Sequence, residues 1–205
     1  MAPHVYLTFL LACLVVVIVP GPTVTLVIAN SLRHGRRAGL LNVFGTQLGL
    51  ACMVTVVLVG LSSVMAIVGT WFFWIRLAGA LYLIWLGWKL WTAAGQAQGE
   101  GAGPAAPRGG FFLQGLLVAL SNPKTLLFFG AFFPQFLDPA RDLHGQILMM
   151  GATAMAVAAI SDSAYALLAA RAGTMLTARR SRLLMRTSGG FLIGGGLWLA
   201  LGRAK

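Results

Sequence analysis

The sequence has little charge, and very little of that charge is acidic. Charged residues make up 9% of the 205-residue chain, and only four residues are Asp or Glu. Soluble domains carry about 25% charged residues, so this composition argues against a water-soluble globular protein. The rest of the composition agrees, because 59% of the residues are hydrophobic and the mean hydropathy is +0.86. We therefore expect a polytopic membrane protein.

Residues that carry catalytic and metal chemistry are also scarce. The two cysteines, Cys13 and Cys52, lie in apolar segments without a C-x-x-C spacing, where cysteine packs as a small hydrophobic residue. His4, His34 and His144 fall at ends or in loops, which is a poor arrangement for a metal cluster. The sequence contains no Walker motif, catalytic triad or zinc motif. We expect neither an enzyme nor an ATP-driven pump, and no cofactor.

Long apolar runs are what the sequence has in abundance. A helix crosses a bilayer with about 20 apolar residues, and several runs reach that length. They are 5–32, 40–66, 71–91, 111–137, 145–170 and 184–202. The sequence thus predicts an all-α membrane protein with six transmembrane helices.

Basic residues give the chain a formal net charge of +11. They lie beside the predicted spans and do not gather on one soluble face, so nucleic-acid binding is not indicated. When every second loop is assigned to the cytoplasm, that side collects Arg33, Arg36, Arg37, Lys89, Arg108, Arg171, Arg179, Arg180, Arg182 and Arg186. The other side receives Arg141, Arg203 and Lys205. This bias follows the positive-inside rule and predicts that both termini lie outside.

A segment rich in Gly, Ala and Pro, residues 93–110, separates the third span from the fourth. Its composition cannot build a core and is typical of a flexible linker. We expect it to lie in the cytoplasm and to divide the chain into two three-helix halves, residues 1–92 and 111–205.

The two halves carry matching motifs in the same order. Residues 20–23 interrupt the first span with prolines, and residues 121–124 interrupt the fourth span at the corresponding place. The third span of each half begins with R-x-x-G, at Arg76 and at Arg186. Two copies of a three-span repeat must enter the membrane in opposite orientations. The sequence therefore predicts two inverted three-helix repeats with broken first and fourth helices.

The helix breaks have a predictable local structure. Pro20 and Pro22 remove backbone donors from the first span, and Gly21 is suited to cap a new helix that starts at Pro22. In the fourth span, Asn122 is a favourable N-cap and Pro123 follows it. Each restarted helix directs its unpaired N–H groups and positive dipole end toward the membrane centre. The pattern predicts an anion site between the halves, although kinks that only aid packing are the alternative.

Two ionisable residues fall near the middle of predicted spans, Lys124 and Asp162. Intramembrane charges face a partner or an internal cavity because lipid cannot solvate them. We expect Lys124 and the helix ends around Thr23 to receive a substrate carboxylate, and Asp162 to receive an ammonium group, a proton, or both in turn. A permanent ion pair between Lys124 and Asp162 is the structural alternative.

The second span also contains polar side chains, at Asn42, Thr46 and Gln47. They are suited to line a cavity, and Gln47 is a candidate for substrate binding. Alternatively, Gly45 and Gly49 form a G-x-x-x-G contact with another helix, across which the polar groups form hydrogen bonds.

Taken together, several motifs resemble the LysE/RhtB family of bacterial amino-acid exporters. They are Pro20-Gly21-Pro22, "SLRHGRRAGLLNVFGTQLG", "GALYLIWLGWK", "NPKTLLFFGAFFPQF" and "SGGFLIGGGLWLALG", which occur in order over nearly the whole chain. The resemblance implies a six-helix inner-membrane exporter of amino acids or derivatives such as homoserine, homoserine lactone, threonine, lysine or leucine, driven by the proton motive force. In this chain Asn122-Pro123-Lys124 matches the family's fourth-span motif, and Asp162 stands where many members carry an acidic residue. Arg76 departs from the neutral residue of many members.

The sequence as a whole favours a secondary transporter of amino acids that works by proton antiport and alternating access in the bacterial inner membrane. Small-residue faces also allow a homodimer. Two alternatives stay open: an exporter of metal cations, which needs more carboxylates or thiols, and a membrane thiol redox protein, which needs a cysteine pair near the breaks.

Overall fold

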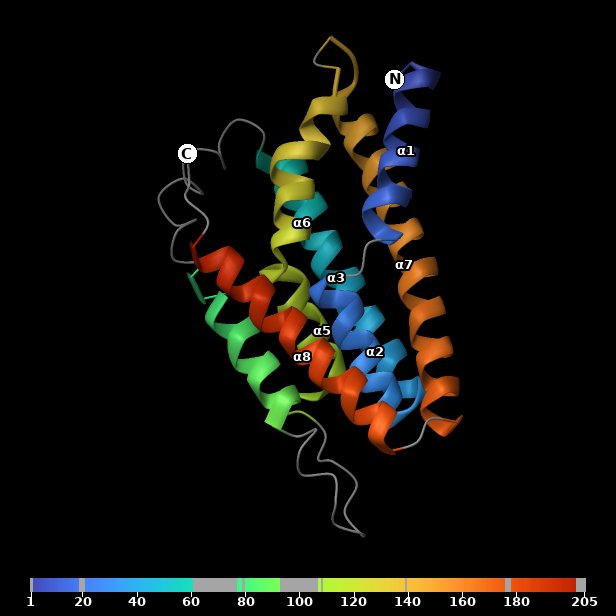
Figure 1. Cartoon of the computed structure of the whole chain (residues 1–205). Coiled ribbons are helices and arrows are strands. Elements are labelled where there is room, and N and C mark those ends of the chain that lie inside the picture. The colour runs from blue at the N-terminus through green and yellow to red at the C-terminus, as the bar shows by residue number, and fades with distance from the viewer. Residues whose placement is uncertain are drawn as a thin grey trace.

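The computed structural model describes residues 2–18, 21–60, 77–78, 80–92, 107, 109–138, 140–175 and 178–201. Every regular element in these ranges is helical, as the apolar runs predicted (Figure 1). The helices are α1 (Pro3–Ile18), α2 (Pro22–His34), α3 (Arg36–Gly60), α5 (Gly110–Ser121), α6 (Pro123–Leu127), α7 (Leu143–Met175) and α8 (Ala178–Leu201). Residues 80–92 form a further helical segment.

Both predicted helix breaks are present. The axes of α1 and α2 differ by 48°, and those of α5 and the helical stretch Pro123–Phe136 by 49°. Gly21 caps α2 in an extended conformation with Pro22 as the first helical residue, and Asn122 caps α6 in the same way ahead of Pro123. The similar bends and the matching proline placement confirm a helix break at each of the two predicted places.

The region after α6 is irregular. A π-helical turn, Phe128–Phe132, is followed by a 3-10 turn, Phe133–Phe136. Such π-turns insert an extra residue into a helix and shift the direction of the side chains that follow. This change allows the aromatic residues of the segment to face α1, where Phe9 contacts Phe128, Phe133 and Phe136.

Two single helices in the described part of the chain are long and apolar enough to cross a membrane, Arg36–Val59 and Leu143–Gly173. The number rises to four if each bent pair is one span. The predicted third span lies partly outside the described residues, as do Arg76 and most of the predicted linker 93–110. The six spans and their inverted repeat therefore stay predictions.

Helix α3 is the central packing element, in contact with both α5 and α7. A methyl group added at Gly45 would overlap the carbonyl oxygen of Phe112, and one at Gly115 would overlap that of Asn42. The contact predicted for Gly45 and Gly49 therefore exists, and it joins α3 to α5. Gly35 follows the last residue of α2. It adopts φ 79°, a backbone conformation that favours glycine and permits the tight turn from α2 into α3.

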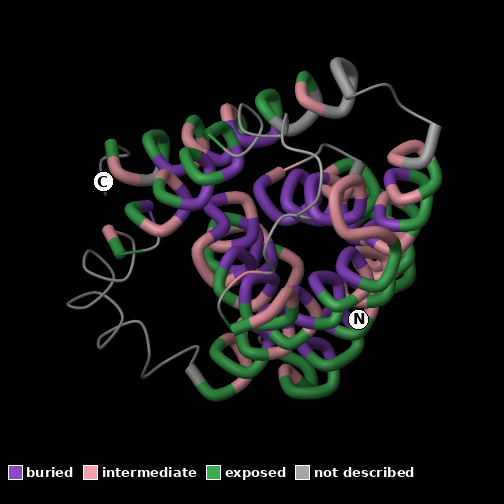
Figure 2. Tube along the Cα trace, turned by 90° about the horizontal axis from the view of Figure 1, so that it is seen from below, coloured by how far each residue is buried: buried purple, intermediate pink, exposed green. Residues whose placement is uncertain are grey.

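Burial is arranged as expected for a membrane protein. Buried residues gather between the helices, and exposed positions lie around the outside (Figure 2). Many exposed positions are large and apolar, including Ile160, Val59 and Leu168 at 73%, 71% and 68% exposure. Apolar side chains over so much of the outer surface suit contact with lipid.

Candidate functional site

The two helix breaks contact each other. Asn122 Nδ2 donates a hydrogen bond to Thr23 Oγ1 at 3.3 Å, which joins the first turn of α2 to the cap of α6. The Asn122 Oδ1 atom accepts a second bond from the Lys124 backbone N–H at 3.0 Å. Gly21 lies against the Lys124 side chain, since a Cβ at Gly21 would stand 3.4 Å from Lys124 Cε. Segments about a hundred residues apart thus meet at one place.

Lys124 also connects the second break to the end of α1. Its ammonium group donates a hydrogen bond to the Val16 carbonyl oxygen at 2.9 Å. Val16 is in the last turn of α1, where carbonyl groups have no partner within the helix and the helix dipole is negative. Lys124 therefore acts as a cap for the interrupted helix. The sequence predicted a substrate contact for Lys124 and gave no sign of this capping.

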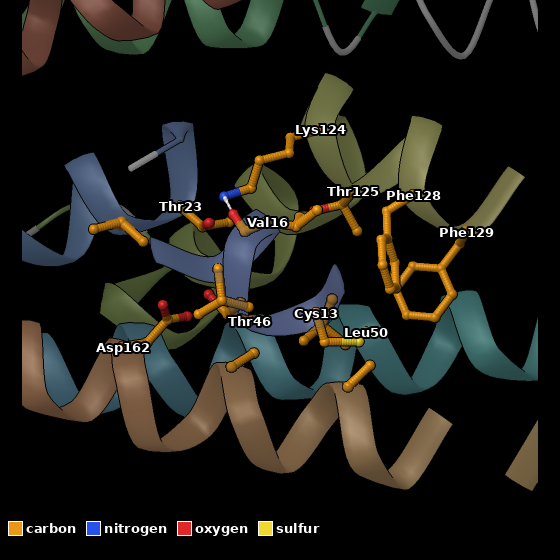
Figure 3. A pocket seen from close by; sticks show the side chains of 14 residues that line it. Cys13, Val16, Thr23, Thr46, Leu50, Lys124, Thr125, Phe128, Phe129 and Asp162 are labelled. Carbon is orange, nitrogen blue, oxygen red and sulfur yellow. Dashed lines mark hydrogen bonds between the residues drawn. The ribbon is translucent and has the colours of Figure 1, made fainter. Parts of the chain in front are cut away.

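A cavity of about 60 Å³ opens beside the two breaks (Figure 3). Its volume is sufficient for a few water molecules. The wall is formed by α1, α2, α3, α6, the π-turn and α7, through Cys13, Val16, Val17, Thr23, Val24, Thr46, Leu50, Lys124, Thr125, Phe128, Phe129, Ala154, Ala158 and Asp162. Thr23, Thr46, Asp162 and the Lys124 ammonium group lie toward one end of the cavity, and Phe128 and Phe129 stand at the other, with Thr125 beside Phe128.

Asp162 reaches this cavity from α7. Its side chain is 4% exposed and lies across the cavity from the Lys124 backbone, so both predicted intramembrane charges line the same space (Figure 3). An acidic and a basic group around one small volume can together hold a zwitterion. Asp162 and Lys124 thus line an internal cavity, as expected of charges in apolar segments.

The other predicted residues lie around the cavity or away from it. Pro22 and Pro123 are buried in the first turns of α2 and α6, where each fixes the start of its helix. Pro20 lies outside the described residues. Gln47 does not belong to the cavity wall. Its side-chain amide contacts the backbone of α7. In the amide orientation that satisfies both of its polar atoms, the nitrogen donates to Met155 O and the oxygen accepts from Ala159 N, both at 3.2 Å.

Asn42, for which the sequence left two roles open, forms hydrogen bonds between helices. Asn30 Nδ2 donates to Asn42 Oδ1 at 2.7 Å and to Gln114 Oε1 at 2.9 Å, and Asn42 Nδ2 donates to the Phe111 carbonyl. This buried amide cluster joins α2, α3 and α5. Sequence reasoning missed Asn30 and Gln114, although their position as single amides in apolar segments was a usable signal.

Thr46 is the second residue left open, and it lies in the cavity wall. Within the described residues, no three His, Cys, Asp or Glu side chains lie close enough together to hold a metal ion. Cys13 is buried in the wall, Cys52 is exposed, and both are free thiols.

These features define a helical membrane protein with an internal site between two interrupted helices. The model of the family described as LysE type translocator matches residues 14–203. The chain belongs to this family, as the motifs indicated. It is accordingly a transporter and not an enzyme.

Relatives agree with this assignment. An uncharacterized membrane protein of Vibrio cholerae is 33% identical over 98% of both chains. A homoserine/homoserine lactone efflux protein of Salmonella typhimurium is 33% identical over 81% of both chains. A leucine efflux protein of Klebsiella pneumoniae is 33% identical over 65% of this chain and 63% of its own. No solved structure matches the chain.

Proposed function

We propose that this protein exports an amino acid or an amino-acid derivative, which binds in the cavity beside the two helix breaks. The observation that carries the proposal is the convergence of Thr23, Lys124 and Asp162 on that cavity. A free amino acid is a zwitterion, and its two charges match a lysine and an aspartate held in a low-dielectric surrounding. Relatives named as homoserine and leucine efflux proteins support the same substrate class.

The export is driven by proton antiport in the bacterial inner membrane. In this mechanism Asp162 binds the substrate ammonium group on the cytoplasmic side and a proton on the outer side. The same carboxylate therefore cannot carry both at once, which couples the two flows. Alternating access follows from rocking of residues 1–92 against residues 111–205, as in other inverted-repeat transporters. The hydrogen bond of Asn122 to Thr23 supports this scheme, because it joins the two helix breaks.

Uptake into inside-out membrane vesicles tests the proposal. The vesicle lumen corresponds to the cell exterior, so export appears as accumulation of a labelled amino acid. We expect accumulation of at least one member of an amino-acid panel, increased by an acidic lumen and abolished by an uncoupler. Vesicles without the protein are the control. No uptake of any member contradicts amino-acid export, whereas uptake indifferent to the gradient contradicts proton antiport alone.

A further inference from the structure

Thr46 has a buried hydroxyl group with an unusual surrounding. The residue is 3% exposed, and its Oγ1 atom has no hydrogen-bond partner among the described residues. Threonines in helices ordinarily bond a carbonyl one turn back. Thr55, in the same helix, does so with the Ala51 carbonyl at 2.9 Å. A buried hydroxyl without a partner is costly, and the described residues contain two, at Ser31 and Thr46. Of these, Thr46 lines the cavity, where a ligand can supply the missing partner.

The position of Thr46 indicates what that ligand carries. Thr46 lies at the polar end of the cavity, on the same side as Asp162 (Figure 3). A group placed between them meets a hydroxyl oxygen and a carboxylate, both of which accept hydrogen bonds. An ammonium group has several N–H donors and a positive charge, so it satisfies both acceptors at once. A carboxylate in the same place would be repelled by Asp162.

The opposite end of the cavity has a different chemistry. Cys13, Leu50, Phe128 and Phe129 form most of its wall, and Thr125 beside Phe128 adds a hydroxyl group. The two phenylalanines belong to the π-helical turn, with ring centroids 5.1 Å apart in an edge-to-face arrangement. A charged substrate side chain, or one with several polar groups, would lose most of its water there with little replacement. An aliphatic side chain gains from the same burial.

We propose that Thr46 is a substrate-binding residue whose hydroxyl accepts a hydrogen bond from the ammonium group of an amino acid with an apolar side chain. The side chain lies against Leu50, Phe128 and Phe129. This assignment rests on the proposed function and adds to it a residue and a substrate class. It also explains why a transporter retains an unpaired hydroxyl in its core.

Transport kinetics of Thr46→Val and Thr46→Ser test the assignment. Valine keeps the shape of threonine without the hydroxyl, while serine keeps the hydroxyl. For labelled leucine we expect Thr46→Val to raise KM about tenfold with little change in the maximum rate, since a charge-assisted hydrogen bond is lost. Thr46→Ser restores KM to within a small factor. Thr55→Val is the matched control, because it makes the same change in α3 away from the cavity and leaves KM unaltered.

Competition with unlabelled compounds separates the two parts of the proposal. We expect leucine and methionine to compete better than homoserine, lysine or glutamate. The deaminated analogue 4-methylpentanoate lacks the ammonium group, so Thr46→Val and the unchanged protein should bind it equally weakly. A larger effect of Thr46→Val on the analogue than on leucine overturns the role of Thr46. Better competition by homoserine overturns the apolar substrate class.

The remaining outcomes are equally distinct. An unchanged KM in Thr46→Val, with leucine still transported, means that water alone occupies the site, and it overturns this inference without touching the proposed function. Failure of the unaltered protein to transport any amino acid overturns both. Folding of each variant is checked by gel filtration in detergent. Thr46→Ser keeps the test decisive if Thr46→Val does not fold.

Discussion

In the proposed mechanism, Asp162 is the side chain that couples transport to protons. We expect Asp162→Asn to bind and exchange substrate weakly and to lose all dependence on a pH gradient, because an amide neither binds a proton nor carries charge. The substitution conserves volume, so folding should survive. Uptake into vesicles with and without an imposed gradient measures the effect. Asp142→Asn, an exposed residue at the start of α7, is the control and should retain coupling. Gradient-dependent uptake by Asp162→Asn would rule out the proton-carrying role.

Residues with a full charge were easier to place from the sequence than neutral polar ones. Lys124 and Asp162 had to face an interior because lipid cannot solvate them, and both line the cavity. Thr46 and Gln47 carry no such demand. They are neighbours in α3, yet Thr46 lies in the wall while Gln47 rests on α7. Sequence reasoning favoured Gln47 as a site residue, and the structure gives the cavity position to Thr46.

Among the elements, the two helix breaks are joined by the hydrogen bond from Asn122 to Thr23. We expect Asn122→Ala to lower the free energy of unfolding by about 1–2 kcal/mol, because it removes the α6 cap as well as the bond to Thr23. Thr23→Val removes only the bond. Unfolding of the single and double variants in detergent forms a double-mutant cycle. The combined loss should be smaller than the sum of the single losses, whereas strict additivity would mean that the breaks are not coupled.

The close contact of α3 with α5 makes a second prediction for the elements. A methyl group at Gly45 would overlap the backbone carbonyl of Phe112, which cannot move without shifting α5. We expect Gly45→Ala to lower the free energy of unfolding by about 1–3 kcal/mol. Gly194→Ala is the matched control in α8, since no atom lies within 4 Å of its added carbon. The melting temperature of Gly194→Ala in detergent should equal or exceed that of the unaltered protein. Equal stability of both variants would contradict close helix packing at Gly45.

The helix caps were predictable from sequence because they are local. A proline at the first helical position, with Gly21 or Asn122 before it, specifies a start through backbone chemistry within a few residues. The bond of Lys124 to Val16 was not predictable in this way. It joins segments far apart in the chain, and only the packing of α1 against the second break brings the two groups together.

For the whole molecule, membrane orientation is the property to test. In Figure 1, α1 begins at the upper side, α8 rises from its start near the bottom to an end at about mid-height, and the α2–α3 turn lies near the bottom. We expect both termini to lie outside the cell. The α2–α3 turn, with Arg33, Arg36 and Arg37, should lie in the cytoplasm. In a Cys13→Ala, Cys52→Ala background, Ala2→Cys should react with a membrane-impermeant maleimide on intact cells. Arg36→Cys should react only after permeabilisation. The reverse pattern would invert the assigned direction of transport.

The same cysteine-free protein serves a second purpose. Unchanged transport in the Cys13→Ala, Cys52→Ala background excludes the thiol redox alternative, because no other cysteine exists in the chain. As the control for the labelling experiment, the Cys13→Ala, Cys52→Ala protein without an added cysteine must show no maleimide labelling.

Sequence alone is enough to identify a helical membrane protein of the LysE type translocator family and to locate its two helix breaks, at residues 20–23 and 121–124. Composition, local proline chemistry and the order of the motifs suffice for that, because none of them depends on how helices are rotated. Only the packing of the helices shows which neutral side chains line the cavity. Helices α3 and α7 carry only a few polar side chains among many apolar ones, since lipid and protein interior both accept apolar groups. Their sequences therefore lack the broad polar face that orients a helix in water, and close contacts such as that at Gly45 set the rotation instead.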